Sequence, residues 1–197
     1  MTDTAGYLDL NQDLYRAHFE RALAYDAYVA TADPKHLPRW EQALGAARLT
    51  EAQAELLAGF TRKLYVLVLS GTWCGDCIRE CPLYHLIAQA APSVDLRFLD
   101  RDENPELTDL LRVAGAKKVP VAVFLSEDFF EVGRFGDRTL SIYRAKAERE
   151  LGAACATGIV PPEQAALAVE LQEWVDIFEW MHLILRTAPL LRRRYGD

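Results

Sequence analysis

The 197-residue sequence is 51% hydrophobic and 26% charged, ordinary values for a globular protein that exclude disorder over most of its length. Its 22 basic and 29 acidic residues give a net charge of −7, which repels phosphate backbones, so we expect no nucleic-acid partner. No basic segment followed by an apolar run opens the chain, and no stretch approaches the roughly 20 apolar residues of a membrane span, so we expect a soluble cytoplasmic protein without a membrane partner.

The first sixty residues carry helical patterns. Asp9 with Gln12, and Thr50 with Gln53, have the spacing of a capping box, in which side chains satisfy backbone N–H groups at a helix start. Apolar residues follow at three- and four-residue intervals, and prolines interrupt the pattern between the two boxes. We expect about three short helices in this part of the chain.

A buried strand follows these helices. Residues 64–69 form a continuous apolar run rich in strand formers, which is typical of a strand covered on both faces. The run ends at Ser70 and Gly71, and a helical pattern begins at the cysteines that follow, with Pro82 as its expected kink. The chain therefore passes from a central strand directly into a helix.

Two more strands and a hairpin complete the expected core. Residues 94–99 are predicted to form a second strand, and Asn104 with its following proline begins a helix that we expect to stop at Gly115. Residues 119–125 are a third apolar strand, and residues 129–135 its hairpin partner. This order predicts an α/β fold with a mixed central sheet flanked by helices.

The rest of the chain is helical again. We expect one helix over residues 139–155 and another from Pro161 onward. The second carries Trp174, Phe178 and Met181 in a wide apolar stripe, which favours a core-facing helix. The expected division of this single structural domain is an N-terminal helical extension over 1–61, a core over 62–138 and a C-terminal helical extension over 139–197.

Three of the four cysteines lie in one short segment, which indicates reactivity or metal binding rather than a structural disulfide framework. Cys74 stands at the predicted helix start, where unpaired backbone N–H groups and the helix dipole favour a thiolate. Cys77 follows almost one turn later, close enough for a disulfide and sheltered by the next layer of structure. Cys74 is the candidate nucleophile and Cys77 the candidate resolving thiol.

The segment from Trp73 to Cys77, placed between a strand and a helix, resembles the active site of the thioredoxin family. Pro82 stands where that family has its helix-kinking proline, Val119 with Pro120 resembles its cis-proline dipeptide, and Gly136 also fits its pattern. The resemblance covers residues 64–136. It is more specific toward a bacterial thioredoxin-like subgroup that has a CGDC active site and helical extensions at both ends.

The resemblance implies a thioredoxin fold with extra terminal helices and a thiol-disulfide oxidoreductase without cofactor or metal. Cys74 would attack the disulfide of a protein or low-molecular-weight thiol substrate, and Cys77 would displace the reduced product. A reductase or thiol donor would then restore the dithiol. The substrate-binding residues that the resemblance implies are Trp73, Gly75, Asp76, Val119 and Pro120.

Two positions depart from the family pattern. Val68 and Phe98 stand where thioredoxins hold a buried aspartate and lysine, so both members of an ion pair are replaced by apolar groups. The aspartate assists deprotonation of the resolving cysteine, and nothing in the first strand is expected to take its place. Asp76 replaces a proline, and we expect its charge to oppose the Cys74 thiolate, which favours a reductant over a strong oxidant.

Other interpretations stay open on the sequence alone. Cys74, Cys77 and Cys81 are three potential sulfur ligands for a metal, although the four histidines are scattered without zinc-site spacing. The fold is also compatible with a redox-inactive binding or dimerisation module, in which the helical flanks form a homodimer or bind a partner. For Cys81 itself, a small buried apolar filler is favoured over a second resolving thiol.

Overall fold

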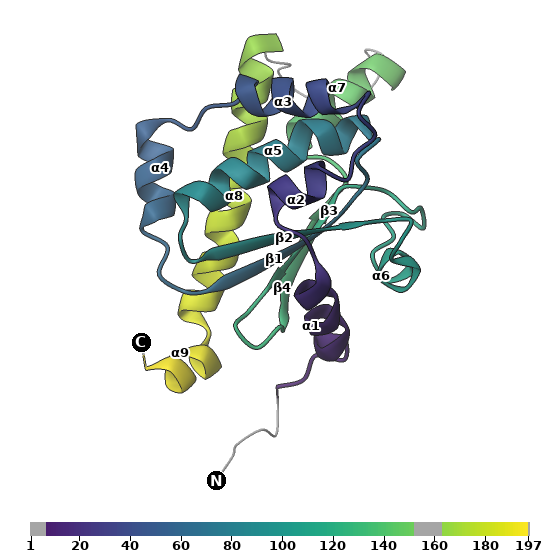
Figure 1. Cartoon of the computed structure of the whole chain (residues 1–197). Helices are drawn as coiled ribbons and strands as arrows, with labels where there is room; N and C mark the ends of the chain where they lie inside the picture. Colours follow the sequence, from purple (N-terminus) through teal and green to yellow (C-terminus); the bar gives the residue numbers. More distant parts are fainter. Residues whose placement is uncertain (1–6, 152–162, 197) are drawn as a thin grey trace.

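The computed structural model describes residues 7–151 and 163–196 (Figure 1). In these ranges, four helices precede the first strand: α1 (Gln12–Arg21), α2 (Tyr25–Val29), α3 (Leu37–Ala46) and α4 (Glu51–Ala58). The central elements are β1 (Leu64–Ser70), α5 (Gly75–Ala90), β2 (Val94–Asp100), α6 (Pro105–Leu110), β3 (Val121–Leu125) and β4 (Glu131–Gly136). The described chain ends with α7 (Leu140–Leu151), α8 (Glu163–Thr187) and α9 (Pro189–Tyr195).

The four strands form one mixed sheet in the order β2-β1-β3-β4. The first strand is central: β1 runs parallel to β2 and antiparallel to β3, and β3 pairs antiparallel with β4. All residues of β1 except Tyr65 are buried, as its continuous apolar run predicts. The mixed α/β sheet flanked by helices, with additional C-terminal helices, is therefore confirmed.

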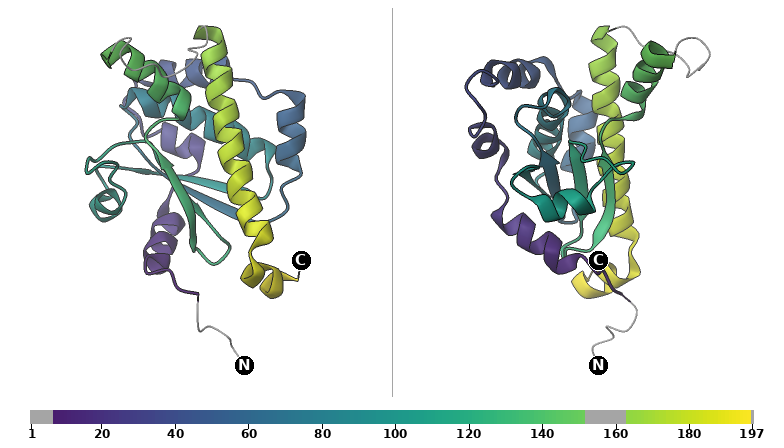
Figure 2. Two further views of the ribbon diagram at one scale, coloured as in Figure 1. Left: turned by 180° about the vertical axis from the view of Figure 1, so that it is seen from behind. Right: turned by 90° about the vertical axis from the view of Figure 1, so that its right-hand side faces the viewer.

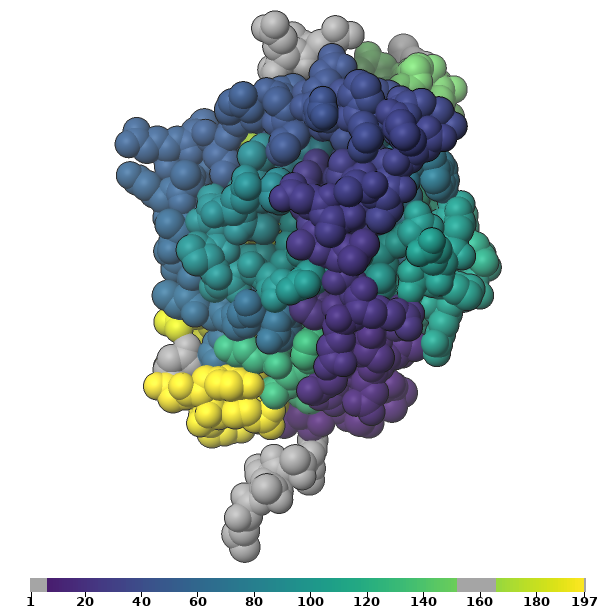
Figure 3. Space-filling model, in the orientation of Figure 1, coloured from purple at the N-terminus to yellow at the C-terminus, as the bar shows by residue number. Residues whose placement is uncertain are grey.

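Helices cover both faces of the sheet. On one face, α2 stacks Tyr28 on Phe98 of β2 with ring centroids 5.3 Å apart, and α8 packs Phe178 edge-on against Phe124 of β3 at 5.0 Å. Figure 2 shows α8 running along the molecule beside the sheet. On the other face, Phe19 of α1 contacts Tyr65 of β1 at 4.8 Å. In the space-filling view, the N-terminal helices spread over much of the core (Figure 3).

The two capping boxes predicted near the N-terminus have different outcomes. The box of Thr50 and Gln53 is confirmed, because each side chain binds the backbone N–H of the other at the start of α4. The box of Asp9 and Gln12 is wrong. The Asp9 carboxylate instead accepts from the N–H of Asn11 at 2.8 Å and from that of Glu131, the first residue of β4, at 2.6 Å.

Several predicted boundaries also shift. The helix after Asn104 ends at Leu110, before an isolated bridge and a turn in which Gly115 has φ +78°. The third strand begins at Val121 instead of residue 119, and its partner covers Glu131–Gly136. The predicted helix over 139–155 is described only as α7, and the part that holds Cys155, like the predicted start at Pro161, lies outside the described residues.

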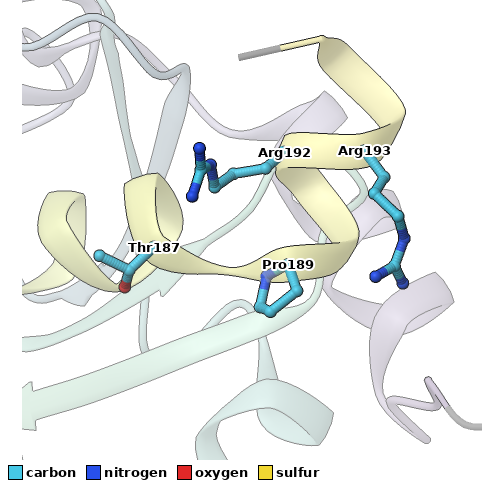
Figure 4. Close-up of a pocket in the computed structure, with 4 residues that line it drawn as sticks. All are labelled: Thr187, Pro189, Arg192 and Arg193. Carbon is cyan, nitrogen blue, oxygen red and sulfur yellow. The ribbon is translucent and has the colours of Figure 1, made fainter.

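The C-terminal helices place their apolar stripe in the core. Trp174, Phe178 and Met181 are 1%, 0% and 2% exposed, so they do not face a partner. A cavity of about 330 Å³ lies at the junction of α8 and α9, lined by Thr187, Pro189, Arg192 and Arg193 (Figure 4). No helix within the described ranges is long and apolar enough to cross a membrane.

Val68 and Phe98 occupy neighbouring positions in the sheet. The parallel register of β1 and β2 pairs the two residues, and both side chains are fully buried. The two apolar residues that stand in place of the usual charged pair are thus direct neighbours on adjacent strands. Tyr28 completes it by stacking on the Phe98 ring.

We expect Val68→Asp to lower the free energy of unfolding by about 3–5 kcal/mol, because it places an unpaired carboxylate in this apolar layer. Adding Phe98→Lys to the same chain supplies the opposite charge on the neighbouring strand, so the double variant should regain part of the loss. Urea unfolding followed by circular dichroism measures both effects. Equal stability of the parent and Val68→Asp proteins would contradict this account of the core.

Candidate functional site

The segment with the CGDC sequence lies at the junction of β1 and α5. Cys74 is the N-cap residue of α5, with an extended backbone at φ −80° and ψ 129°, and Gly75 begins the helix. The Trp73 ring packs directly on Gly71, since a Cβ at this position would lie 3.0 Å from the ring. The strand-to-helix placement of the two cysteines that the sequence predicts is therefore present.

The two sulfurs differ in their access to solvent. Cys74 is half-buried, Cys77 is fully buried, and both are free thiols. The Cys74 Sγ lies 3.8 Å from the carbonyl oxygen of Val119, which precedes Pro120 across a cis peptide bond. The structure thus brings the cysteine segment next to the Val119–Pro120 dipeptide, 45 positions after Cys74, and leaves Cys74 the more accessible of the two cysteines.

The reduced pair favours protonated thiols. The hydrogen bond with Cys77 and partial burial raise the pKa of the Cys74 thiol, while the backbone N–H groups of Cys77 and Asp76 at the helix start act in the opposite direction. Burial raises the pKa of Cys77 well above its ordinary value. The helix start alone does not make Cys74 a strongly acidic thiol.

Asp76 is held in ion pairs. Its carboxylate accepts from Arg79 at 2.9 Å and from Arg138, which follows β4, and Arg138 also pairs with Asp137. We expected the Asp76 charge to oppose the Cys74 thiolate, but the raised pKa of Cys74 comes from Cys77 and from burial. Two guanidinium groups balance the carboxylate, and the backbone N–H of Asp76 favours the thiolate.

A buried acidic pair behind Asp76 escaped the sequence analysis. Glu80 and Glu170 are 0% and 1% exposed, and Arg79 binds both, at 2.8 Å and 3.1 Å. Tyr84 donates a hydrogen bond to Glu80 at 3.0 Å. Burial raises the pKa of both carboxyl groups. Arg79 thus joins α5 to α8 directly behind the cysteines.

Residues from other elements support the cysteine segment. The indole N–H of Trp40 in α3 donates to the carbonyl of Thr72 at 3.0 Å. The Arg101 guanidinium lies 4.7 Å from the ring centre of Trp73, whose side chain is 44% exposed. Gly75 lines a cavity of about 290 Å³ with residues of α3, α5 and α8. The helical pattern of the first sixty residues carried no signal for the hydrogen bond of Trp40.

Cys81 and His85 each contact residues other than Cys74. Cys81 is fully buried, with its Sγ 3.4 Å from the Ser70 hydroxyl oxygen. His85 stacks on Tyr25, with ring centroids 4.1 Å apart. Among residues 7–151 and 163–196, no group of three or more histidine, cysteine, aspartate or glutamate side chains is arranged to hold a metal ion.

Comparison with known proteins identifies the family. A family model described as thioredoxin matches residues 22–149, so the chain belongs to the thioredoxin family. A crystal structure of a protein of unknown function from Pseudomonas aeruginosa is 19% identical with a TM-score of 0.61, over 83% of this chain and 98% of that chain. An HIV epitope-scaffold is 18% identical with a TM-score of 0.60, over 81% and 96%. No curated protein sequence matches the chain. The two structures bear on the fold alone.

We expect Cys74 to react slowly with iodoacetamide at neutral pH and faster as the pH rises, because the alkylated species is the thiolate and its pKa is raised. Cys77 should remain protected, since its sulfur is fully buried. Mass spectrometry of time points across the pH range measures both sites. A rate plateau extending into acidic solution would contradict the assignment, because it would reveal a strongly acidic thiol.

Proposed function

We propose that this chain is a thiol-disulfide oxidoreductase that acts as a reductant through Cys74 and Cys77. The observation that carries the proposal is the unequal access of two hydrogen-bonded thiols at a helix start. Cys74 is reachable from solvent and Cys77 is not. An accessible sulfur is suited to meet a substrate, and a sheltered one to react only with its neighbour.

The reaction transfers two electrons from the chain to the substrate. The Cys74 thiolate attacks one sulfur of the substrate disulfide, forming a mixed disulfide and releasing the other sulfur as a thiolate that takes up a proton. Cys77 then loses its proton and attacks Cys74. The bond between Cys74 and the substrate breaks, the second substrate sulfur leaves as a thiol, and a Cys74–Cys77 disulfide remains.

The raised thiol pKa values support the reducing direction. A strongly oxidising member of this chemistry has a reduced form that is stabilised as the thiolate. A dithiol whose thiolate gains little stabilisation is therefore oxidised more easily to its disulfide, and it acts as a reductant. Here burial and the shared hydrogen bond disfavour ionisation of both thiols. A reductase or small thiol donor would return the disulfide to the dithiol.

The proposed substrate surface surrounds the Cys74 sulfur. It consists of the exposed Trp73 ring, the Gly75 and Asp76 positions between the cysteines, and the Val119–Pro120 loop. The Val119 carbonyl beside Cys74 is available to an extended substrate backbone, in the manner of an added strand. The substrate is a disulfide of a protein or of a low-molecular-weight thiol, and we place the reaction in the cytoplasm.

A binding or dimerisation module is a second candidate function. Trp180 and Leu183 on α8 are 57% and 51% exposed, which offers an apolar surface for a second copy or another protein. This surface, rather than the buried Trp174 stripe, is the one that a partner would meet. The CGDC subgroup, the three-part division of the chain and the homodimer remain predictions.

We expect the purified protein to reduce a model protein disulfide with a thiol donor and Cys74→Ser to abolish this activity. Cys77→Ser should accumulate a mixed disulfide at Cys74, because the attack that releases the product is lost. Turnover measures the first effect, and intact-mass spectrometry under non-reducing conditions measures the second.

Cys155→Ser is the matched control, since it removes a cysteine outside the CGDC segment, and it should keep parental activity. A parent protein that reduces no disulfide but sediments as a dimer would favour the binding module. Tightly bound metal in freshly reduced protein would favour the metal site.

A further inference from the structure

A small polar group lies beneath the cysteine pair in an otherwise apolar layer. Ser70 ends β1, Cys77 and Cys81 are one turn apart on α5, and all three side chains are fully buried. The Ser70 hydroxyl and the Cys81 sulfur are 3.4 Å apart. Cys81 raises the pKa of the Cys77 thiol and the Ser70 hydroxyl lowers it, so both act on that sulfur. Two neutral polar groups, themselves in contact, therefore lie beside the proposed resolving sulfur.

Ser70 lies close to Val68, the position at which thioredoxins hold a buried aspartate. Side chains two residues apart in a strand point to the same face, so Ser70 follows Val68 on the face that α5 covers. Val68 and Phe98 place apolar side chains at the two strand positions that face each other before Ser70. Ser70 is the next side chain along the strand and the one that reaches the cysteines.

Ser70 and Cys81 favour different protonation states of Cys77. Cys77 needs an acceptor while it carries its proton and a donor once it is a thiolate. Cys81 favours the protonated form of Cys77, and the Ser70 hydroxyl favours the thiolate. A hydroxyl can rotate between two neighbours, so Ser70 can bind Cys81 in the resting dithiol and turn to Cys77 on ionisation.

We propose that the Ser70 hydroxyl donates a hydrogen bond to the Cys77 sulfur as it ionises to attack the mixed disulfide, and that Cys81 holds this hydroxyl at other stages. The inference rests on the proposed function. It assigns no covalent bond to Cys81. Cys77 and Cys81 both lie inside α5, where side chains four residues apart have Cβ atoms about 5–6 Å from each other, beyond the roughly 3.5–4.5 Å of a disulfide. Cys74 precedes the helix with an extended backbone, so this limit does not apply to its pairing with Cys77.

The other titratable groups near this cluster come from α2, α5 and β2. Tyr25 and Tyr28 of α2 and Tyr84 of α5 interact with Cys81, and Tyr28 also interacts with Ser70. Asp100 at the end of β2 is the register partner of Ser70 and interacts with Tyr28. Burial raises the pKa of all three tyrosines, so they stay neutral over the range in which a thiol is titrated. Cys74, Glu80 bound to Tyr84, and Asp26 and His85 beside Tyr25 also lie near the cluster.

The two sulfur attacks can be timed separately with Ellman's reagent. With Cys155→Ser as the background of every protein compared, the first thionitrobenzoate is released when Cys74 attacks the reagent, and the second when Cys77 attacks the resulting mixed disulfide. We expect Ser70→Ala to leave the first release within about twofold and to slow the second about tenfold near neutral pH, as for loss of a hydrogen bond to a charged group. The rates should converge at alkaline pH, where Cys77 is ionised without help.

Three variants separate this role from a structural one. Ser70→Thr keeps the hydroxyl and should restore the second release to within about threefold of the parent. Ser126→Ala removes another buried serine hydroxyl, just after β3, and should leave both releases unchanged. Cys81→Ala should leave the second release within about threefold, since Cys81 forms no bond in the step.

The overturning results are equally specific. A Ser70→Ala protein that releases the second thionitrobenzoate at the parental rate, or slower by one factor at every pH, refutes the donor role. Trypsin cleaves after Arg79, so a disulfide joining the peptides 64–79 and 80–97 in oxidised protein would show that Cys81 acts covalently and overturn the inference. A parent that releases no second thionitrobenzoate refutes the proposed function instead.

Discussion

The start of α5 is the constraint on which the site depends. Cys74 caps this helix with an extended backbone, so its sulfur stands at the surface while the next turn carries Cys77 inward. The backbone N–H groups of the first turn lower the pKa of Cys74, whereas burial and the second thiol raise it by more. Chemistry at this site therefore follows from a difference in access more than from an unusually acidic sulfur.

The charges around the cysteines are arranged to balance one another. Arg79 contacts Asp76, Glu80 and Glu170, and Arg138, which follows β4, also binds Asp76. Removing Arg79 would leave the buried acidic pair without its cation, which is strongly destabilising for a buried charge pair. The same contacts tie α8 and the segment after β4 to the helix that carries the cysteines.

The helices outside the sheet take part in the site. Trp40 from α3 binds the loop before Cys74, Tyr28 from α2 packs on Phe98, and Glu170 from α8 binds Arg79. The apolar pair of Val68 and Phe98 needs such a cover, because its stability comes from exclusion of water instead of an ion pair. The flanks and the family core are thus one packed unit in the described residues.

Local patterns were enough to predict the α/β class, the strand that leads into the cysteine helix and the capping box at Thr50, because each depends on residues close in sequence. The facing positions of Val68 and Phe98 came instead from the resemblance to thioredoxins. The roles of Cys74, Cys77 and the Val119–Pro120 loop stay predictions. The tertiary structure alone decided that Asp9 binds Glu131 instead of capping a helix, that two arginines share Asp76, and that Ser70 and Cys81 meet at Cys77. These outcomes depend on which polar groups are left to satisfy one another once distant elements have packed, and no local pattern records that competition.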